Sequence, residues 1–155
     1  MDCDYKSYVI ILFLEKNRIL NIGKLGKIFF KSGFYVYCGS AKKNIKQRIK
    51  RHAKAFKRHY WHVDYLRQYC KFIDSFIADG TKTECEISKK LKDISENSIL
   101  GFGCSDCNCI SHLYYFNTNP IYNIQFQHMI LDLSMKRLRL IQILNNFIQT
   151  QFNIL

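Results

Sequence analysis

An unbroken run of apolar residues near the start of the chain, Tyr8–Leu14, constrains the fold most strongly. A strand with one face in water alternates apolar and polar side chains, whereas a strand covered on both faces is apolar throughout. The run therefore predicts a central strand with other elements packed on both of its faces. Tyr8 lies at the entrance of this strand.

Residues 33–52 predict a strand, a turn and a helix in succession. Aromatic and β-branched residues from Phe34 to Tyr37 favour the strand. Gly39, followed by Ser40, favours a turn at which the missing side chain lets another group approach the backbone. Tyr37 is thus expected near the end of a strand, beside an open stretch of backbone.

The helix that follows is expected to bury one face and to carry two polar side chains beside that face. Ile45, Ile49 and Phe56 are spaced for the buried face. Arg48 and His52, one turn apart, border it, so their side chains are expected to converge on the preceding turn.

Positive charge is concentrated on the same segment. The formal net charge is +12, and nine of the 24 lysine and arginine residues lie within residues 42–58. One buried guanidinium site would need far fewer cations, so this cluster predicts a surface that faces phosphate groups. A lysine-rich composition can also serve solubility alone. The residues assigned to nucleic-acid binding are Gly39, Lys42, Lys43, Lys46, Lys50, Arg51 and Lys54.

Four separated motifs carry a family resemblance. Tyr37-Cys38-Gly39-Ser40, followed by a helix with Arg48-x-x-x-His52, resembles the second half of the GIY-YIG nuclease signature. Together with residues 61–66, 84–86 and 101–113, it is similar to the small Uri-type endonucleases, which are sometimes fused to an endonuclease III-like repair enzyme. The resemblance covers about residues 5–117.

The resemblance implies an α/β fold in which helices flank a small mixed sheet. It also implies a metal-dependent, structure-selective DNA endonuclease linked to DNA repair or processing, with Tyr8, Tyr37, Arg48, His52 and Glu84 at its catalytic centre. One tyrosine would accept the proton of the nucleophilic water while the other positions the site. Beside an arginine and a metal ion, the pKa of a phenol, ordinarily about 10, is expected to fall.

These residue types suit phosphodiester cleavage. Arg48 offers a permanently protonated fork that matches phosphate oxygens. Thr83 and Glu86 form a predicted capping box, which places Glu84 in the first turn of a helix. Glu84 is expected to bind Mg²⁺ or Mn²⁺ with water and substrate phosphate, with Glu86 as the rival ligand. His52 is expected to orient the site or to shuttle protons near neutrality.

Two further clusters are expected to be structural. Trp61-His62-Val63-Asp64 is expected to cap a helix and to hold the basic helix. Cys104, Cys107, Cys109 and His112 are numerous enough for a zinc site, but most structural zinc sites draw pairs of ligands from two separate elements. Because no distant residue obviously completes this crowded set, we expect it to be free of metal.

Several connecting elements can also be predicted. Arg18–Ile22 and Lys27–Phe30 flank a turn bounded by glycines and predict a hairpin. A helix is expected around residues 60–70, and strands at Phe72–Ala78 and His112–Phe116. From Ile124 onward, a 3-to-4 rhythm of apolar residues predicts one long helix.

We therefore divide the chain into a nuclease-like domain of residues 1–118 and a C-terminal helical extension of residues 119–155. The extension carries two apolar faces and should not stand alone in water. It is expected to pack back on the sheet, to pair with a second copy in a homodimer, or to lie on a membrane. We favour the first two and expect no membrane partner.

The chain shows no sign of export. Acidic residues occupy the positions where a secretory signal carries cations, and the first apolar run is too short to span a bilayer. Seven cysteines, an odd number, do not suit a secreted disulfide framework. We expect a cytoplasmic protein with reduced thiols.

Two other functions remain open at this point. A non-catalytic nucleic-acid-binding module on the same scaffold would be marked by loss of Tyr8, Tyr37, Arg48 or Glu84, and all four are present. A metal-binding or scaffold subunit of a larger assembly would need a metal at the cysteine cluster or an obligate partner. In these cases Arg48 is a solvated cation and the tyrosines pack the core.

Overall fold

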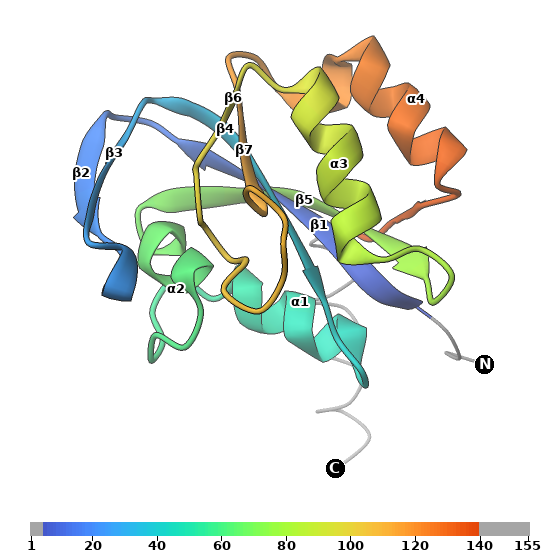
Figure 1. Ribbon diagram of the computed structural model, residues 1–155, viewed down its shortest axis with the longest axis horizontal. Helices are drawn as coiled ribbons and strands as arrows, with labels where there is room; N and C mark the ends of the chain where they lie inside the picture. Colours follow the sequence, from blue (N-terminus) through green and yellow to red (C-terminus); the bar gives the residue numbers. More distant parts are fainter. Residues whose placement is uncertain (1–4, 140–155) are drawn as a thin grey trace, which may run out of the picture.

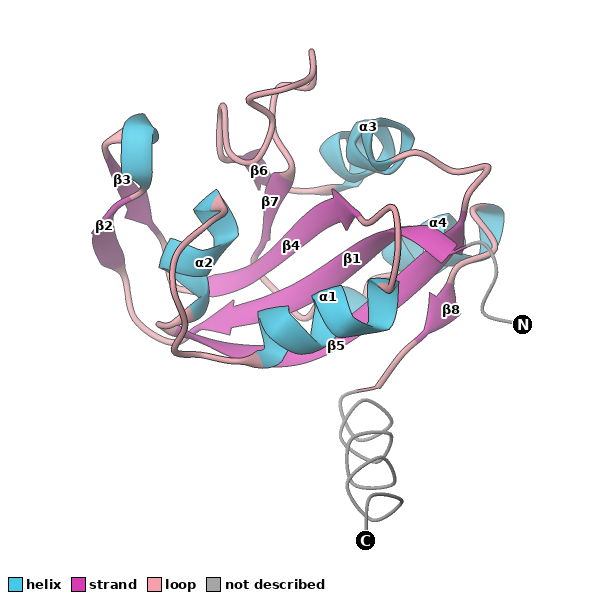
Figure 2. Ribbon diagram, turned by 90° about the horizontal axis from the view of Figure 1, so that it is seen from below, coloured by secondary structure: helices cyan, strands magenta, loops and turns pink. Residues whose placement is uncertain are grey.

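The computed structural model describes residues 5–139, in which helices lie on both faces of a six-stranded sheet (Figure 1, Figure 2). The strands of this sheet are β1 (Tyr5–Leu14), β4 (Gly33–Ser40), β5 (Cys70–Asp79), β6 (Asn97–Ser98), β7 (Leu113–Phe116) and β8 (Lys136–Arg137). A separate hairpin consists of β2 (Arg18–Asn21), the 3-10 helix η1 (Gly23–Leu25) and β3 (Lys27–Phe30). The remaining elements are α1 (Ile45–Ala53), α2 (His62–Arg67), α3 (Glu84–Ile94), the 3-10 helix η2 (Pro120–Tyr122) and α4 (Ile124–Asp132).

The strands follow the order β6-β7-β4-β1-β5-β8, and all neighbouring pairs are antiparallel. The expected α/β arrangement of a sheet flanked by helices is confirmed, but the expectation of a mixed sheet is wrong. Leu14 lies opposite Gly33 on one side and opposite Cys70 on the other. The chain thus re-enters the sheet beside the end of β1 both times, which produces antiparallel neighbours.

The prediction of a central strand covered on both faces is confirmed by β1. Alternate residues of a strand point to opposite faces. Tyr8, Ile10, Leu12 and Leu14 belong to one apolar cluster, and Val9 and Ile11 belong to the other. All six side chains are at most 1 % exposed. Each such burial stabilises the fold by about 1.5–3 kcal/mol, so β1 anchors two cores at once.

Helices α1 and α2 cover one face of the sheet, and α3 and α4 cover the other (Figure 1, Figure 2). The first core contains Ile45 and Ile49 from α1 together with Val63 and Leu66 from α2. The second core contains side chains of α3 and α4. The predicted hairpin, the helix after residue 60 and the strands at Phe72–Ala78 and near His112–Phe116 are also found.

The basic helix is shorter than its apolar spacing predicts. Helix α1 ends at Ala53, and the side chain of Phe56 is 85 % exposed, so its assignment to the buried face is wrong. The buried guanidinium of Arg67 donates hydrogen bonds to the carbonyl oxygens of His52 and Ala53, at 2.8 and 2.6 Å. In a longer helix these carbonyls would accept hydrogen bonds from backbone N–H groups of the next turn. Arg67 therefore ends α1 at a point where the sequence pattern predicts that it continues.

The expected long C-terminal helix is wrong for the described residues. Helix α4 ends at Asp132, and Ser134 adopts the left-handed conformation, with φ of 51°. The chain then returns to the sheet as β8, and Met135 and Leu138 are buried there. The spacing of Met135 and Leu138 is that of a buried helix face, but the two residues flank a short strand. The rest of the expected helix lies outside the described residues.

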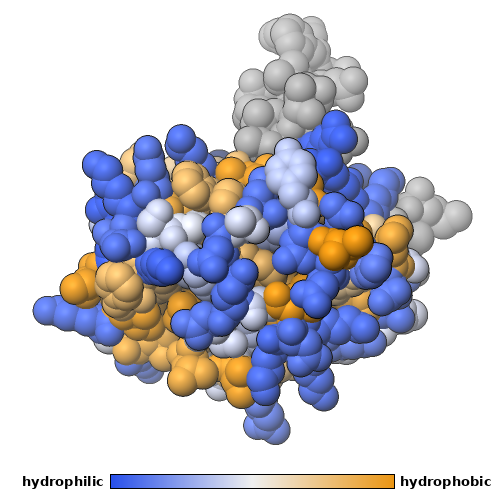
Figure 3. All heavy atoms as spheres, turned by 90° about the horizontal axis from the view of Figure 1, so that it is seen from above, coloured by the Kyte–Doolittle hydropathy of each residue, from blue (hydrophilic) through white to orange (hydrophobic). Residues whose placement is uncertain are grey.

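The surface of the described protein mixes hydrophilic and apolar areas. Figure 3 shows hydrophilic side chains over most of the face that it views, with apolar patches between them. Within residues 5–139, no helix is long and apolar enough to cross a membrane.

The packing of α4 on the sheet gives a first prediction. Phe126 is 1 % exposed and its ring contacts those of Phe76 and Phe116. Phe126→Ala should lower the free energy of unfolding by about 3–5 kcal/mol, because it leaves a cavity in the second core. Leu131→Ala on the same helix is the control, because Leu131 is 74 % exposed. Urea denaturation of both variants measures the difference, and equal stabilities would contradict the packing.

Candidate active site

A polar pocket with a volume of about 360 Å³ opens where the ends of β1 and β4 meet α1, α2, α3 and the loop before β7. Four of the five predicted catalytic residues line it: Tyr8, Tyr37, Arg48 and Glu84. The fifth, His52, lies behind the pocket against Tyr8. The remaining lining residues are Gly39, Ser40, Tyr60, Trp61, His62, Gly103, Ser105 and Asp106. Residues far apart in the sequence thus meet in one place.

Gly39 makes room for the side chain of Tyr8. The two residues are directly opposite each other in the antiparallel pair of β1 and β4. A Cβ atom on Gly39 would lie 2.5 Å from the Tyr8 hydroxyl oxygen, closer than atoms of this kind approach. The group that approaches the open backbone at Gly39 is therefore the phenol of Tyr8.

His52 holds the other side of the Tyr8 hydroxyl. Its Nε2 lies 2.7 Å from Tyr8 Oη, and the His52 side chain is fully buried. Burial lowers the pKa of His52 to about 3, and the nearby Lys57, Arg51 and Arg48 add to this effect against the attraction of Asp64. The imidazole is therefore neutral at physiological pH, and the expectation that His52 titrates near neutrality is not supported.

The two pocket tyrosines are also less acidic than expected. Burial raises the pKa of Tyr8 and of Tyr37 above the ordinary value of a phenol. Arg48 acts in the opposite direction on Tyr8, but its effect is smaller than that of burial. The expected fall of the phenol pKa is thus not found in the protein itself, because both rings extend into the core behind the pocket.

Arg48 reaches the pocket across the face of Trp61. The carbon at the centre of its guanidinium lies 4.3 Å from the ring centroid, and Nη1 donates a hydrogen bond of 3.3 Å to the carbonyl oxygen of Ser40. A guanidinium has five N–H groups, so donors remain for an anion. The stacking on Trp61 restricts the guanidinium to the pocket wall.

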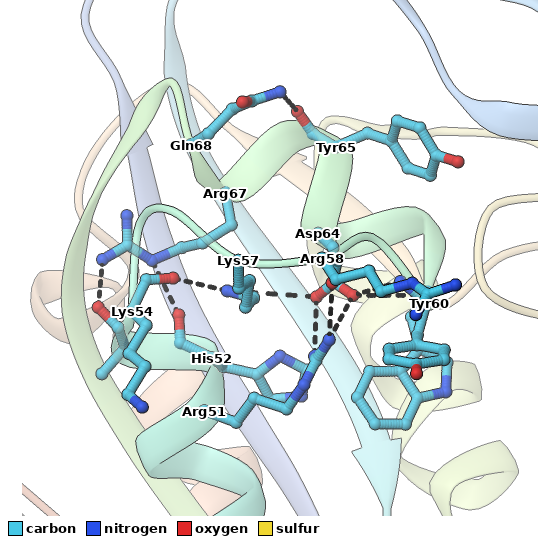
Figure 4. Close-up of polar contacts among 12 residues, drawn as sticks. Arg51, His52, Lys54, Lys57, Arg58, Tyr60, Asp64, Tyr65, Arg67 and Gln68 are labelled. Carbon is cyan, nitrogen blue, oxygen red and sulfur yellow. Dashed lines mark hydrogen bonds and ion pairs between the residues drawn. The ribbon is translucent and has the colours of Figure 1, made fainter.

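Asp64 organises the loop that carries Trp61 (Figure 4). Its fully buried carboxylate accepts hydrogen bonds from the backbone N–H groups of Tyr60 and Trp61, at 2.8 and 3.0 Å. Both terminal nitrogens of Arg51 donate to it as well, each at 3.0 Å. Burial opposes ionisation, but these donors prevail and lower the pKa of Asp64. The predicted capping device that holds the basic helix is confirmed.

The cations assigned to nucleic-acid binding do not line the pocket. Lys42, Lys43, Lys46 and Lys54 are exposed on α1 and the segments beside it, and Lys50 is half-buried. The guanidinium of Arg51 is committed to Asp64, so we leave Arg51 out of a DNA-facing surface.

Glu84 lies in the first turn of α3, as the capping pattern predicts. Thr83 Oγ1 accepts a hydrogen bond of 3.1 Å from the N–H of Glu86. Glu84 lines the pocket, whereas Glu86 does not. Glu84 Oε2 also lies 4.0 Å from Nδ1 of the buried His112. The carboxylate thus borders both the pocket and the histidine behind it.

Sequence reasoning assigned no role in the site to several polar residues that line the pocket, among them Asp106 and His62. Asp106 contributes a second carboxylate, and the Nδ1 atom of His62 accepts a hydrogen bond of 2.9 Å from the N–H of Gly103. Gly103 has a φ of 72°, which favours glycine, and its backbone passes close to Tyr37. Asp106 and His62 belong to two of the sequence motifs described above, but nothing in the spacing of these motifs shows that they face the same pocket.

Only one group of three or more metal-binding side chains is close enough, within residues 5–139, to share one ion. It consists of Cys85, Cys107, Cys109 and His112. Cys104, one of the four residues weighed for zinc, is not in this group, and Cys85 from α3 takes its place. The expectation that no distant residue completes the cluster is therefore wrong.

The fold and site define an α/β protein with a polar pocket beside a basic helix. The chain belongs to the family named Domain of unknown function DUF123, whose model matches residues 7–135. No curated protein and no solved structure matches it significantly.

This match overturns the resemblance to the GIY-YIG nucleases and their Uri-type branch, because the family that covers the motifs is DUF123. The motifs are short, and the structure gives two of their residues local roles. Gly39 accommodates Tyr8, and His52 binds the Tyr8 hydroxyl.

The buried His52 gives a prediction about pH. Its pKa of about 3 in the folded protein lies below its value of about 6.5 in the unfolded chain, so below pH 6.5 the unfolded chain binds the extra proton. Stability should therefore fall by about 2 kcal/mol between pH 6.5 and pH 5. His52→Gln should flatten this dependence.

Urea denaturation at a series of pH values measures the effect. The control is His128→Gln, because His128 is exposed on α4. This control should keep the slope of the unaltered protein, and an unchanged slope in His52→Gln would refute the low pKa.

Proposed function

We propose that the protein is a metal-dependent endonuclease that hydrolyses phosphodiester bonds in DNA. One observation carries the proposal: an arginine, three phenols and two carboxylates line one polar pocket, next to a helix rich in lysine. Hydrolysis of a phosphodiester needs neutralised phosphate oxygens, an oriented water molecule and a stabilised leaving oxygen. The pocket has a candidate group for each task.

Arg48 is proposed to bind the non-bridging oxygens of the scissile phosphate. Its planar fork matches two phosphate oxygens. Its position against Trp61 reduces the entropy that is lost when it grips a substrate. We therefore expect Arg48 to stabilise the charge that develops in the transition state.

Tyr8 is proposed to orient the attacking water. In the tautomer of neutral His52 that carries its proton on Nδ1, Nε2 accepts a hydrogen bond from the Tyr8 hydroxyl, which leaves the Tyr8 oxygen free to accept one from water. When the water oxygen attacks phosphorus, the bond between phosphorus and the leaving oxygen breaks, one water proton passes to Tyr8 Oη, and the Tyr8 proton passes to His52 Nε2. The leaving oxygen takes a proton from solvent. Negative charge that develops on the phosphate favours the protonated form of His52 and thus acts against the effect of burial on its pKa. Tyr37, on the neighbouring strand, is proposed to position the phosphate.

Glu84 is proposed to hold the divalent metal, Mg²⁺ or Mn²⁺. The donors fit such an ion in kind, because Glu84 and Asp106 supply hard oxygen atoms and Mg²⁺ commonly binds through one or two carboxylates. When bound, the ion would polarise the phosphate and assist the leaving oxygen.

DNA is proposed to lie over α1 and the segment before it. Lys42, Lys43, Lys46 and Lys54 are exposed there, with Lys50 on the same helix. Lysine contacts to phosphate carry no sequence information, so we expect selection by DNA structure, as in DNA repair or processing. The second candidate is a cytoplasmic DNA-binding module without catalysis, which the same exposed lysines favour.

Two groups of variants separate catalysis from binding. Arg48→Ala and Glu84→Gln should bind DNA almost normally and lower the cleavage rate by about 10²-fold or more, because they remove groups aimed at developing charge. Lys54→Ala and Lys43→Ala should cleave at near-normal rates at saturation, with weaker binding at higher salt. Single-turnover cleavage of labelled single-stranded, duplex and flap DNA with Mg²⁺ or Mn²⁺ measures the rates, and binding titrations measure affinity.

Lys27→Ala is the control for loss of one surface charge, because Lys27 is exposed on the hairpin. Arg48→Lys keeps the charge but loses the fork, and its rate should lie between those of Arg48→Ala and the unaltered protein. Binding without cleavage of any DNA would favour the non-catalytic module. Normal cleavage by Arg48→Ala at saturation would remove the assignment of Arg48.

A further inference from the structure

The group of Cys85, Cys107, Cys109 and His112 lies behind the pocket and takes no part in the proposed hydrolysis. Cys85 is in the first turn of α3, and the other three residues belong to the loop that leads into β7. Their ligand atoms all lie within 4.8 Å of one another. Two separate elements thus supply the set, which is how structural zinc sites are usually built.

The geometry suits a tetrahedral ion. With metal–sulfur bonds of about 2.3 Å and a metal–nitrogen bond of about 2.0–2.1 Å, a tetrahedral site separates sulfur from nitrogen by about 3.6 Å. Cys107 Sγ and His112 Nε2 are 3.4 Å apart. This pair is already close to the tetrahedral separation, and the other ligand atoms, all within 4.8 Å of one another, need only move closer together to enclose an ion.

His112 is oriented as a ligand. Its Nε2 faces the sulfur atoms, and its Nδ1 lies 4.0 Å from Glu84 Oε2. Metal-binding histidines commonly direct the second ring nitrogen to a carboxylate, which fixes the tautomer and the ring orientation. His112 is 1 % exposed, and its backbone N–H donates a hydrogen bond of 2.8 Å to the carbonyl oxygen of Phe102, which fixes the backbone at this position.

We propose that Cys85, Cys107, Cys109 and His112 bind one Zn²⁺ ion, with the three thiols releasing their protons to solvent. Thiolate and imidazole ligands in a four-coordinate set select zinc over Mg²⁺. The ion ties the loop of residues 101–112 to the start of α3. That loop carries Gly103, Ser105 and Asp106 into the pocket, and Glu84 is in the same turn as Cys85. The zinc site thus fixes the position of one wall of the pocket.

Elemental analysis of the purified full-length protein tests the proposal independently of any nuclease activity. We expect about one zinc per chain, and a loss of most of it in Cys85→Ser and Cys107→Ser. Cys104→Ser is the matched control, because Cys104 is a buried cysteine of the same loop outside the group. Glu84→Gln should also retain zinc, although the proposed hydrolysis would be lost.

Co²⁺ added to the reduced, metal-stripped protein gives a second readout that does not depend on the folding of variants. We expect the intense visible bands of tetrahedral cobalt and the near-ultraviolet band of cobalt–thiolate bonds. No bound zinc and no such bands would overturn the proposal. A disulfide within the group, detected by mass spectrometry in protein purified with zinc, would overturn it in favour of a redox pair.

Discussion

The fold depends on a central strand that has no solvent-facing side. Because β1 is buried on both faces, each half of the molecule packs against alternate residues of the same ten-residue segment. The same alternation places Tyr8 on the face of α1 and α2, where Gly39 and His52 fix its hydroxyl. The pocket is thus an extension of the first core to the surface, and its tyrosines are held by the packing that stabilises the fold.

Local patterns predicted much of the secondary structure. The apolar run of β1, the hairpin and the cap at Thr83 depend on neighbours in sequence, and all three are found. The errors concern elements whose ends are set by distant residues. Helix α1 ends because Arg67 binds its last carbonyls, and α4 ends because the chain returns to pair with β5. No periodicity contains that information.

The candidate site could be predicted in part for the same reason. Tyr8, Tyr37, Arg48 and Glu84 were found from their motifs, and the structure brings them together. Their environment was not predictable, since the burial that controls the pKa of His52 and of the tyrosines is a tertiary property. Cys85 was missed as a partner of Cys107 because a helix and a distant loop meet only in the folded chain.

The contact of Trp61 with two arginines has a practical consequence. The guanidinium groups of Arg48 and Arg51 lie 4.3 and 4.4 Å from its ring, and Trp61 lines the pocket. It is also the only tryptophan of the chain. The intrinsic fluorescence of the protein therefore originates from a single indole at the pocket wall, and an anion that draws Arg48 away changes the field on that indole. The fluorescence of Trp61 can therefore report the binding of an anion in the pocket without an attached label.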